Sequence, residues 1–509
     1  MPQYLSPGVY VEEVQSGARP IEGVGTAVAA FVGFAENGPF HRPTLVANWN
    51  QYVQNFGGFT EGAYLPHAVY GYFANGGGAA YVVRVGGAAT DGEPEPPAPE
   101  PVRLGGLRIA ALPGAGADIA VEVTDADGEN PPEDRFKLLV RQGGKIAESY
   151  DVSTRKNAKN YVVTQVSERS KLIGVTEQSS GALARPDKQS VALPAAGAGG
   201  AAAAPAKLDA QEYLGDPEAR TGFGGLESID EVTMVVTPDL MSAYQRGMID
   251  LEGVKTVQLA MISHCEQMGD RVAVLDAPPG LSAQQVRAWR MDEAGYDSRY
   301  AALYYPWIKV FDPATGRNTV VPPSGHIAGV WGRNDTERGV HKAPANEVIR
   351  GAVDLDYRLS KSEQDLLNPI GVNCVRAFPG RGIRIWGART LSSDPAWRYL
   401  NVRRLFNYLE ESILIGTQWV VFEPNDDRLW SSIRRNITAF LTEQWRQGAL
   451  FGRTPAEAFY VKCDRDNNPQ ESIDLGQVVC EIGVAPVKPA EFVIFRLSQF
   501  SDSTSLVSE

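Results

Sequence analysis

The apolar run at residues 492–497, close to the end of this 509-residue chain, constrains the fold more than any other stretch. The run is apolar on both faces of a β-strand until Arg496, and such a strand needs cover on both sides and pairing at both edges. Chain ends usually fray because few contacts hold them. The sequence therefore predicts a strand that is held either by its own subunit or by a neighbouring one.

The chain start carries a second short β-prone run. Residues 7–14 follow a Pro-Gly break, and glycines and a proline separate them from the next apolar run. Two interpretations stay open: an edge strand on its own domain, or an arm that adds a strand to another subunit's sheet through backbone hydrogen bonds. The residues predicted to form inter-subunit arms are Val9, Tyr10, Val11, Glu12 and Val14 at the start, and Phe492, Val493, Ile494, Phe495 and Leu497 at the end.

Charge and cysteine content narrow the possible partners and compartments. The formal net charge of -13 argues against nucleic acid as the main partner, because phosphate binding needs a basic face. The four cysteines form no C-x-x-C pair, which favours buried thiols in a reducing cytoplasm over disulfides or a zinc site. Residues 1–4 do not resemble a signal peptide, and the apolar stretch 24–35 is too short to cross a bilayer. We expect synthesis in the cytoplasm and no direct membrane partner.

Alternating strand and helix patterns predict an α/β core domain from residues 23–87 and 222–370. Ser282 and Gln285 form a capping box that opens one of the helices. Repeated β-α-β units predict a mostly parallel sheet with helices on both faces. The expected strands are 27–34, 80–85, 231–236, 271–276 and 301–310, and the expected helices are 66–75, 241–267 and 282–293.

Residues 88–221 differ in character from the core. They begin with a Pro/Glu-rich linker, and an Ala/Gly tract at 195–206 carries no core-forming side chains. Short strand candidates separated by Gly, Pro, Asp and Asn lie between them, at 107–111, 119–124, 136–141 and 161–166. We therefore expect a mostly β insertion domain on the surface of the protein.

The remaining chain predicts an α+β C-terminal domain over residues 371–488, between an N-terminal arm at 1–22 and a C-terminal arm at 489–509. A helix face runs from Trp397 to Ile413, a strand is expected at 418–423, and a helix with an apolar stripe at 429–447. A capping box, Thr454 with Glu457, opens a short helix before a strand at 459–463. The whole chain is thus predicted to be a multidomain α/β protein with extended β arms.

A search for chemistry finds no catalytic, cofactor-binding or metal-binding residues. The segment from Gly23 to Val28 lacks the third small residue of a dinucleotide-binding loop, and no phosphate-binding loop or nucleophile elbow is present. Two acidic residues lie between His326 and His341 in the sequence. These four residues could form a weak metal cluster, but a loop with solvated charges is favoured. Ser324 and His326 could suggest a nucleophile and a base, but they belong to no recognisable catalytic constellation. These negative results favour a structural protein.

Several stretches resemble the tail sheath family of contractile phage tails and contractile injection systems, especially the extracellular, phage-tail-like systems. They are residues 6–13, 321–330, 338–346, 406–413, 422–425 and 483–492. The resemblance implies a homo-oligomer of stacked hexameric rings around an inner tube, with baseplate and terminal cap proteins as further partners. It implies contraction that drives the tube through a target envelope, without a cofactor, in a particle that is cytoplasmic or released.

The resemblance also implies that a helix of the C-terminal domain faces the tube. The best match is the helix expected at 429–447, where Arg434 and Arg435 project away from the apolar stripe and would make weak, salt-sensitive contacts. The alternative is that both arginines pair with acids of their own subunit. Two other functions stay open: an α/β enzyme, hydrolase-like or nucleotide-binding, with a β insertion, and a static surface polymer that does not contract.

Overall fold

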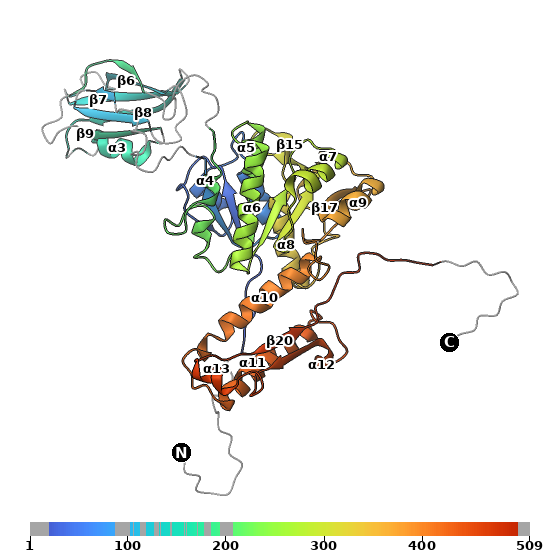
Figure 1. The fold of residues 1–509 in the computed structure, drawn as a ribbon. Helices are drawn as coiled ribbons and strands as arrows, with labels where there is room; N and C mark the ends of the chain where they lie inside the picture. The colour runs from blue at the N-terminus through green and yellow to red at the C-terminus, as the bar shows by residue number, and fades with distance from the viewer. Residues whose placement is uncertain are drawn as a thin grey trace, which may run out of the picture. The chain divides into compact units, whose positions relative to one another are not determined.

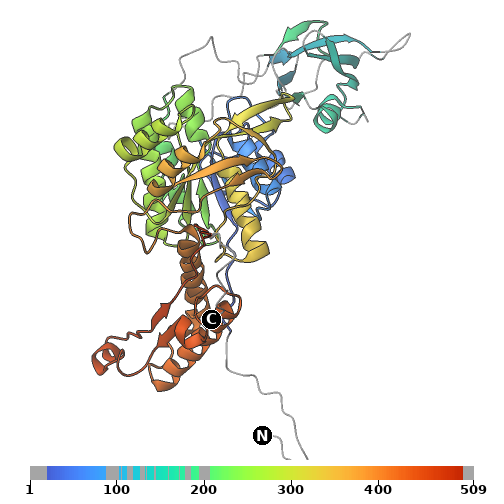
Figure 2. The ribbon, with the colours of Figure 1, turned by 90° about the vertical axis from the view of Figure 1, so that its right-hand side faces the viewer.

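The computed structural model describes residues 20–86 and 207–496, together with residues 102–193 except for 105, 112–118, 127–131, 133, 143–144, 157, 159, 171 and 178–184. It divides into two compact units. One unit comprises Met1–Gly87 and Lys207–Glu509, and the other Ala88–Ala206 (Figures 1 and 2). The predicted N-terminal arm residues, Val9 to Val14, lie outside the described residues.

The first unit is organised around an eight-stranded sheet. Its strand order is β18-β17-β13-β12-β11-β1-β3-β2. All neighbours from β17 to β3 pair in parallel, whereas the outer strands β18 and β2 pair antiparallel. The strands are β1 Ala29–Gly33, β2 Thr44–Val46, β3 Ala80–Arg84, β11 Met234–Val236, β12 Val272–Asp276, β13 Ala301–Tyr305, β17 Val372–Phe378 and β18 Gly382–Ile385. The mostly parallel sheet that the sequence predicts is confirmed.

Helices cover both faces of this sheet, which explains why its central strands are apolar without alternation. Ala30 of β1 faces a cluster with α6 (Leu251–Met268) and α7 (Ala283–Ala288). Its neighbour Phe31 faces the opposite cluster, which holds α2 (Leu65–Ala74) and α8 (Ser324–Arg338). Successive strand residues thus enter different cores. Ser282 and Gln285 form the predicted capping box at the start of α7.

Two predicted core elements are each divided in the structure. The helical pattern at 241–267 forms α5 (Asp239–Gln245) and α6, because Gly247 adopts a left-handed φ of 69° and the Asp250 side chain caps α6. The predicted strand at 301–310 forms β13 and β14 (Ile308–Asp312) on either side of Pro306, which cannot donate to a ladder. β14 pairs instead with β15 (Arg317–Val321) and β16 (Ala352–Leu355) in a separate three-stranded sheet.

The second unit is mostly β where it is described. Its two sheets have the orders β10-β6-β7-β8 and β4-β5-β9. The strands are β4 Val102–Leu104, β5 Leu107–Ala111, β6 Ile119–Asp125, β7 Arg135–Gln142, β8 Lys145–Ser153, β9 Ile173–Glu177 and β10 Ser190–Ala192. The strand predicted at 161–166 is wrong: this segment forms α3 (Val162–Arg169), which buries Val162 and Val166 against the sheets at helical spacing.

The C-terminal region packs helices against a small two-stranded sheet. α10 (Leu400–Gly416) and α11 (Asp427–Arg446) are joined by a turn that contains a single 3-10 helix (Gln418–Val420), so the strand predicted at 418–423 is wrong. β19 (Phe459–Lys462) pairs antiparallel with β20 (Glu481–Val484), and α13 (Gln470–Asp474) lies in the connection. The apolar stripe of α11 supplies the core, as predicted.

The N-terminus of α12 (Pro455–Ala458) departs from the predicted capping box. Thr454 makes no side-chain cap, and the Glu457 carboxylate accepts a hydrogen bond at 2.8 Å from the backbone N–H of Arg453 instead of that of Thr454.

The division of the chain also differs in detail from the predicted boundaries. Residues 207–221 group with the first unit, where Tyr213 enters the core, and the large sheet continues past residue 371 through β17 and β18.

Candidate functional site

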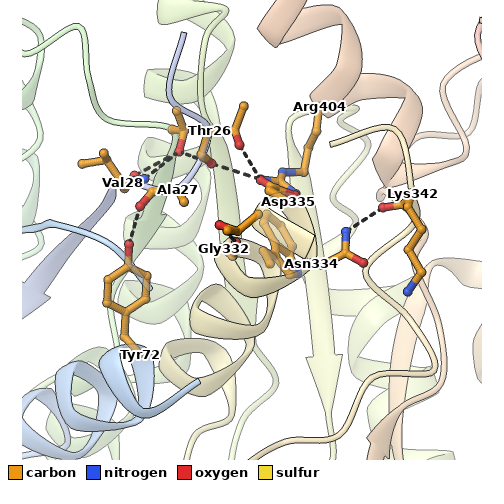
Figure 3. Close-up of polar contacts among 12 residues, drawn as sticks. Thr26, Ala27, Val28, Tyr72, Gly332, Asn334, Asp335, Lys342 and Arg404 are labelled. Carbon is orange, nitrogen blue, oxygen red and sulfur yellow. Dashed lines mark hydrogen bonds and ion pairs between the residues drawn. The ribbon is translucent and has the colours of Figure 1, made fainter. Parts of the chain in front are cut away.

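A buried ion pair joins the α/β core to the first helix of the C-terminal region (Figure 3). Arg404 of α10 donates through both terminal nitrogens to the carboxylate of Asp335 on α8, at 2.9 and 2.5 Å. Both side chains are only 4% exposed. The Arg404 guanidinium also lies 4.8 Å from the ring centroid of Trp331, one turn earlier on α8. This pair fixes the rotation of α10 about α8, because a bidentate contact has a defined geometry.

The segment before β1 is tied into the same joint. The Thr26 hydroxyl donates to Asp335 at 2.7 Å, while the Thr26 carbonyl accepts from Arg404 at 3.2 Å. Further along α10, the backbone N–H of Val24 donates to the Ser412 hydroxyl at 3.2 Å. Ile21 packs into the core of the C-terminal region. Residues 21–26 therefore connect the C-terminal region to the core before the chain enters the sheet.

The residues of the middle motif, 321–330, explain how α8 docks so closely on the sheet and α2. This motif is not a strand: Ser324 begins α8, and its N–H and hydroxyl both donate to Asp276 at the end of β12. Burial raises the pKa of Asp276 to about 7, against the lowering effect of these bonds. A Cβ at Gly325 or Gly329 would lie within 2.5 Å of the α2 backbone. Small residues are therefore required on this face of α8.

The histidines of this region are structural. His326 is buried against Gly71 of α2, and burial lowers its pKa to about 3, so the ring is neutral. His341 stands in the turn after α8, and burial also lowers its pKa. Within residues 20–86, 207–496 and the described part of the insertion, no group of three or more His, Cys, Asp and Glu is placed to hold a metal ion.

The C-terminal segment is anchored at one residue and then becomes exposed. Glu491 accepts from Arg389 at 2.9 and 2.6 Å, from Asn368 at 2.8 Å and from the Tyr399 hydroxyl at 3.3 Å. Burial raises the pKa of Glu491, but the hydrogen bonds from Arg389 and Asn368 outweigh it and leave the pKa below its usual range. This clamp could not be predicted from the sequence, because nothing in a single chain links Arg389 to an acid about a hundred residues later.

Beyond the clamp, the predicted C-terminal strand is not formed within the described residues. Phe492, Val493, Ile494 and Phe495 belong to no helix or strand and are 72%, 68%, 79% and 85% exposed. Leu497 lies outside the described residues. A contiguous exposed run of large apolar side chains marks an interaction site rather than a free end.

The two arginines predicted to face a tube lie on α11 as expected. Arg434 is half-buried and donates to the carbonyl of Cys463 at 3.2 Å, while Arg435 is exposed and donates to the Ser432 hydroxyl at 3.4 Å. Neither has an ion pair within the described part of the chain, in contrast to the alternative that both pair with acids of their own subunit. Their role stays a prediction.

Comparison with known proteins gives the family. Residues 231–391 match the phage tail sheath protein central domain, and residues 392–500 match the phage tail sheath C-terminal domain. The two matches are contiguous and together cover more than half of the chain. The chain belongs to the phage tail sheath protein family and is a structural sheath protein, not an enzyme.

Individual relatives agree with this assignment. The tail sheath protein of Burkholderia phage BcepMu is 25% identical over 98% of this chain and 96% of its own length. The tail sheath protein of Vibrio phage KVP40 is 27% identical over 70% of this chain, which spans about half (54%) of the phage protein. The structure resembles the helical sheath of the anti-feeding prophage in its contracted state, with a TM-score of 0.60, 25% identity and coverage of 97% and 99% of the two chains.

A second solved structure shares the fold. The sheath of an extracellular contractile injection system, PVC, in its contracted state has a TM-score of 0.58, 24% identity and coverage of 98% and 99% of the two chains. Its membership of the tail sheath family makes the chain a component of a phage tail or a tail-like particle. None of the described helices is long and apolar enough to cross a bilayer.

Proposed function

We propose that this protein polymerises as stacked hexameric rings around an inner tube and contracts to drive the tube through a target envelope. The observation that carries the proposal is the run Phe492–Phe495, which is long enough for a strand and exposed on every large side chain. Its own subunit does not pair it within the described residues. The relatives described above are sheath proteins, and two of the similar sheath structures are in a contracted state.

The two-stranded sheet of β19 and β20 is the natural acceptor for such a strand. A sheet of two strands is marginal alone, and an added strand satisfies its open edge with backbone hydrogen bonds. Each such bond is worth about 1 kcal/mol net, so a strand of four or five residues is weak singly and strong when repeated through a lattice. We propose that residues 492–497 of one subunit, together with residues 9–14 of another, extend this sheet.

The remaining assignments follow from the same proposal. Residues 1–22 and 489–509 act as arms, residues 23–87 and 207–391 as the α/β core, residues 392–488 as the C-terminal sheath domain, and residues 88–206 as an outward insertion. The partners are an inner tube protein, a baseplate and a terminal cap. The C-terminal region carries further exposed apolar side chains, Phe422, Phe451 and Leu475, which supports contacts with other subunits there.

Proline scanning of the arm tests the proposal. An added edge strand bonds through alternate backbone N–H groups, and proline removes one of them. We therefore expect different effects from Val493→Pro and Ile494→Pro. One of them should block the formation of tubes, and the other should reduce tube formation less. The measurement is negative-stain microscopy after co-expression with the tube protein. Ile494→Val is the matched control and should assemble normally. Normal, contractile tubes from both proline variants would contradict the arm assignment.

A further inference from the structure

Two cysteines face each other at the end of the β19–β20 sheet. The antiparallel register pairs Lys462 with Glu481 as its last residues. Continuing it by one step places Cys463 opposite Cys480. Directly opposed residues in antiparallel strands have Cα atoms about 4.5–5.5 Å apart, within the roughly 4.4–6.8 Å range that a disulfide spans. Both thiols are free in this structure, and each one contributes to the pKa shift of the other.

The surroundings give the two thiols different roles. Cys463 is fully buried, whereas Cys480 is half-buried and reachable from solvent. Burial raises the pKa of the Cys480 thiol to about 12. Burial also raises the pKa of Cys463, but the hydrogen bond from Cys480 and the nearby Arg434 guanidinium oppose that rise, with Asp464 acting in the other direction. The accessible Cys480 thiol is thus the entry point for an oxidant, and the buried Cys463 thiol is its resolving partner.

We propose that Cys463 and Cys480 form a reversible redox staple that a disulfide oxidant closes. The Cys480 thiolate attacks the oxidant and releases one thiolate, leaving a mixed disulfide on Cys480. The Cys463 thiolate then attacks the Cys480 sulfur, forms the Cys463–Cys480 bond and releases the second thiolate. The two protein thiols lose two electrons and two protons, and the oxidant gains the two electrons as it becomes two thiols.

The staple would close the loop at residues 464–479, which is already organised by polar contacts. Asn468 donates to and accepts from the backbone of Val479, at 2.9 and 2.6 Å, and Asn467 donates to the Lys462 carbonyl at 2.7 Å. Asn425, before α11, donates to the Gln477 carbonyl at 3.0 Å. These contacts hold the two strands in register beside the thiols, so closure requires little movement of the backbone.

The experiment uses the full-length reduced protein and 4,4′-dithiodipyridine as the oxidant. We expect each reacting subunit to release two thiopyridones and keep no adduct. After blocking and denaturation, trypsin should yield residues 463–465 joined to residues 466–496, because cleavage follows Lys462, Arg465 and Arg496, and Pro489 protects the bond after Lys488. The rate should rise about tenfold per pH unit between pH 7 and 9, in step with the thiolate fraction of Cys480.

Matched cysteines within the chain provide the controls. Cys265 and Cys374 are buried singly and should stay unreacted until the protein is denatured. Cys463→Ser should release one thiopyridone per reacting subunit and keep a stable adduct on Cys480. A stable adduct on wild-type Cys480, or no linked peptide after prolonged treatment at pH 9, would overturn the proposal, and neither readout depends on a variant that folds.

Discussion

Asp335→Asn should strongly destabilise the first unit, because it leaves the Arg404 guanidinium buried without its counter-ion. Asp335 accepts three hydrogen bonds, two of them from Arg404, and both partners are 4% exposed. Removing one partner of a buried ion pair costs about 3–5 kcal/mol. With an m-value of about 3 kcal/mol/M in urea, the unfolding midpoint should fall by about 1–1.7 M.

The measurement is urea unfolding of the monomer, followed by circular dichroism for helices and by tryptophan fluorescence, since Trp331 contacts Arg404. If the joint couples the C-terminal region to the core, the transition should also broaden or split in the variant. A midpoint shift below about 0.3 M, corresponding to about 1 kcal/mol, would refute the argument that this buried pair holds the joint.

Two further variants separate burial from ion pairing as such. Replacing the pair with apolar side chains, Asp335→Leu with Arg404→Met, should recover much of the lost stability, because a packed apolar pair avoids the cost of desolvating charges. Arg465→Gln breaks the ion pair with Asp427 at the surface, where the two side chains are 80% and 61% exposed, and should leave the midpoint unchanged within error.

Four other outcomes follow from the structure. Gly329→Ala should lower the free energy of unfolding by about 1–3 kcal/mol, because its Cβ would lie 2.3 Å from a backbone carbonyl oxygen of α2; an unchanged urea midpoint would count against this packing. Asp276 has a raised pKa, so the folded state binds its proton more tightly than the unfolded state, and wild-type stability should decrease as pH rises from about 4 to 7. Asp276→Asn should remove the contribution of Asp276 to this decrease, while Asp239, whose pKa burial also raises to about 7, keeps its own. The stability of the variant relative to wild type should then rise by about 1.4 kcal/mol per pH unit in this window, measured by urea unfolding at each pH, and a constant difference between the two proteins would contradict this. Arg434→Glu with Arg435→Glu should leave the monomer folded by circular dichroism but reduce the yield of extended sheath on tubes, seen by microscopy and sedimentation; an undiminished yield would remove these residues from the tube contact. Replacing residues 88–206 with a short Gly/Ser bridge should leave tube assembly intact, and loss of tubes from a folded, soluble variant would contradict an outward insertion.

The core strands could be predicted because burial on both faces makes their sequence continuously apolar. Glycine and proline mark their ends, as at Gly33 and Pro306. Short apolar runs are less informative, since a strand and one buried helical turn need similar residues. This explains the errors at 161–166, which is helix α3, and at 418–423, which contains only a 3-10 turn.

Only those parts of the candidate site that are contiguous in the sequence could be predicted. The apolar run after Glu491 is one of them, because its residues follow one another in the chain. The ion pair of Arg404 with Asp335 joins residues 69 positions apart, and that of Arg389 with Glu491 joins residues 102 apart, so a single sequence offers no signal that selects either partner.

The joint has a mechanical consequence. Two connections between the core and the C-terminal region meet at this joint: residues 21–28, tied to α8 and α10, and the segment that leads from β18 into α10. A third connection follows β20 and returns Glu491 to Arg389 and Asn368. With one connecting segment, the C-terminal region could rotate about that segment. Two connecting segments held together by a bidentate ion pair resist both rotation and bending of the C-terminal region relative to the core. A force applied through the N-terminal segment would act on several hydrogen bonds of this joint at the same time, so they would have to break together and not one after another. The core and the C-terminal region should therefore turn together when the chain is pulled.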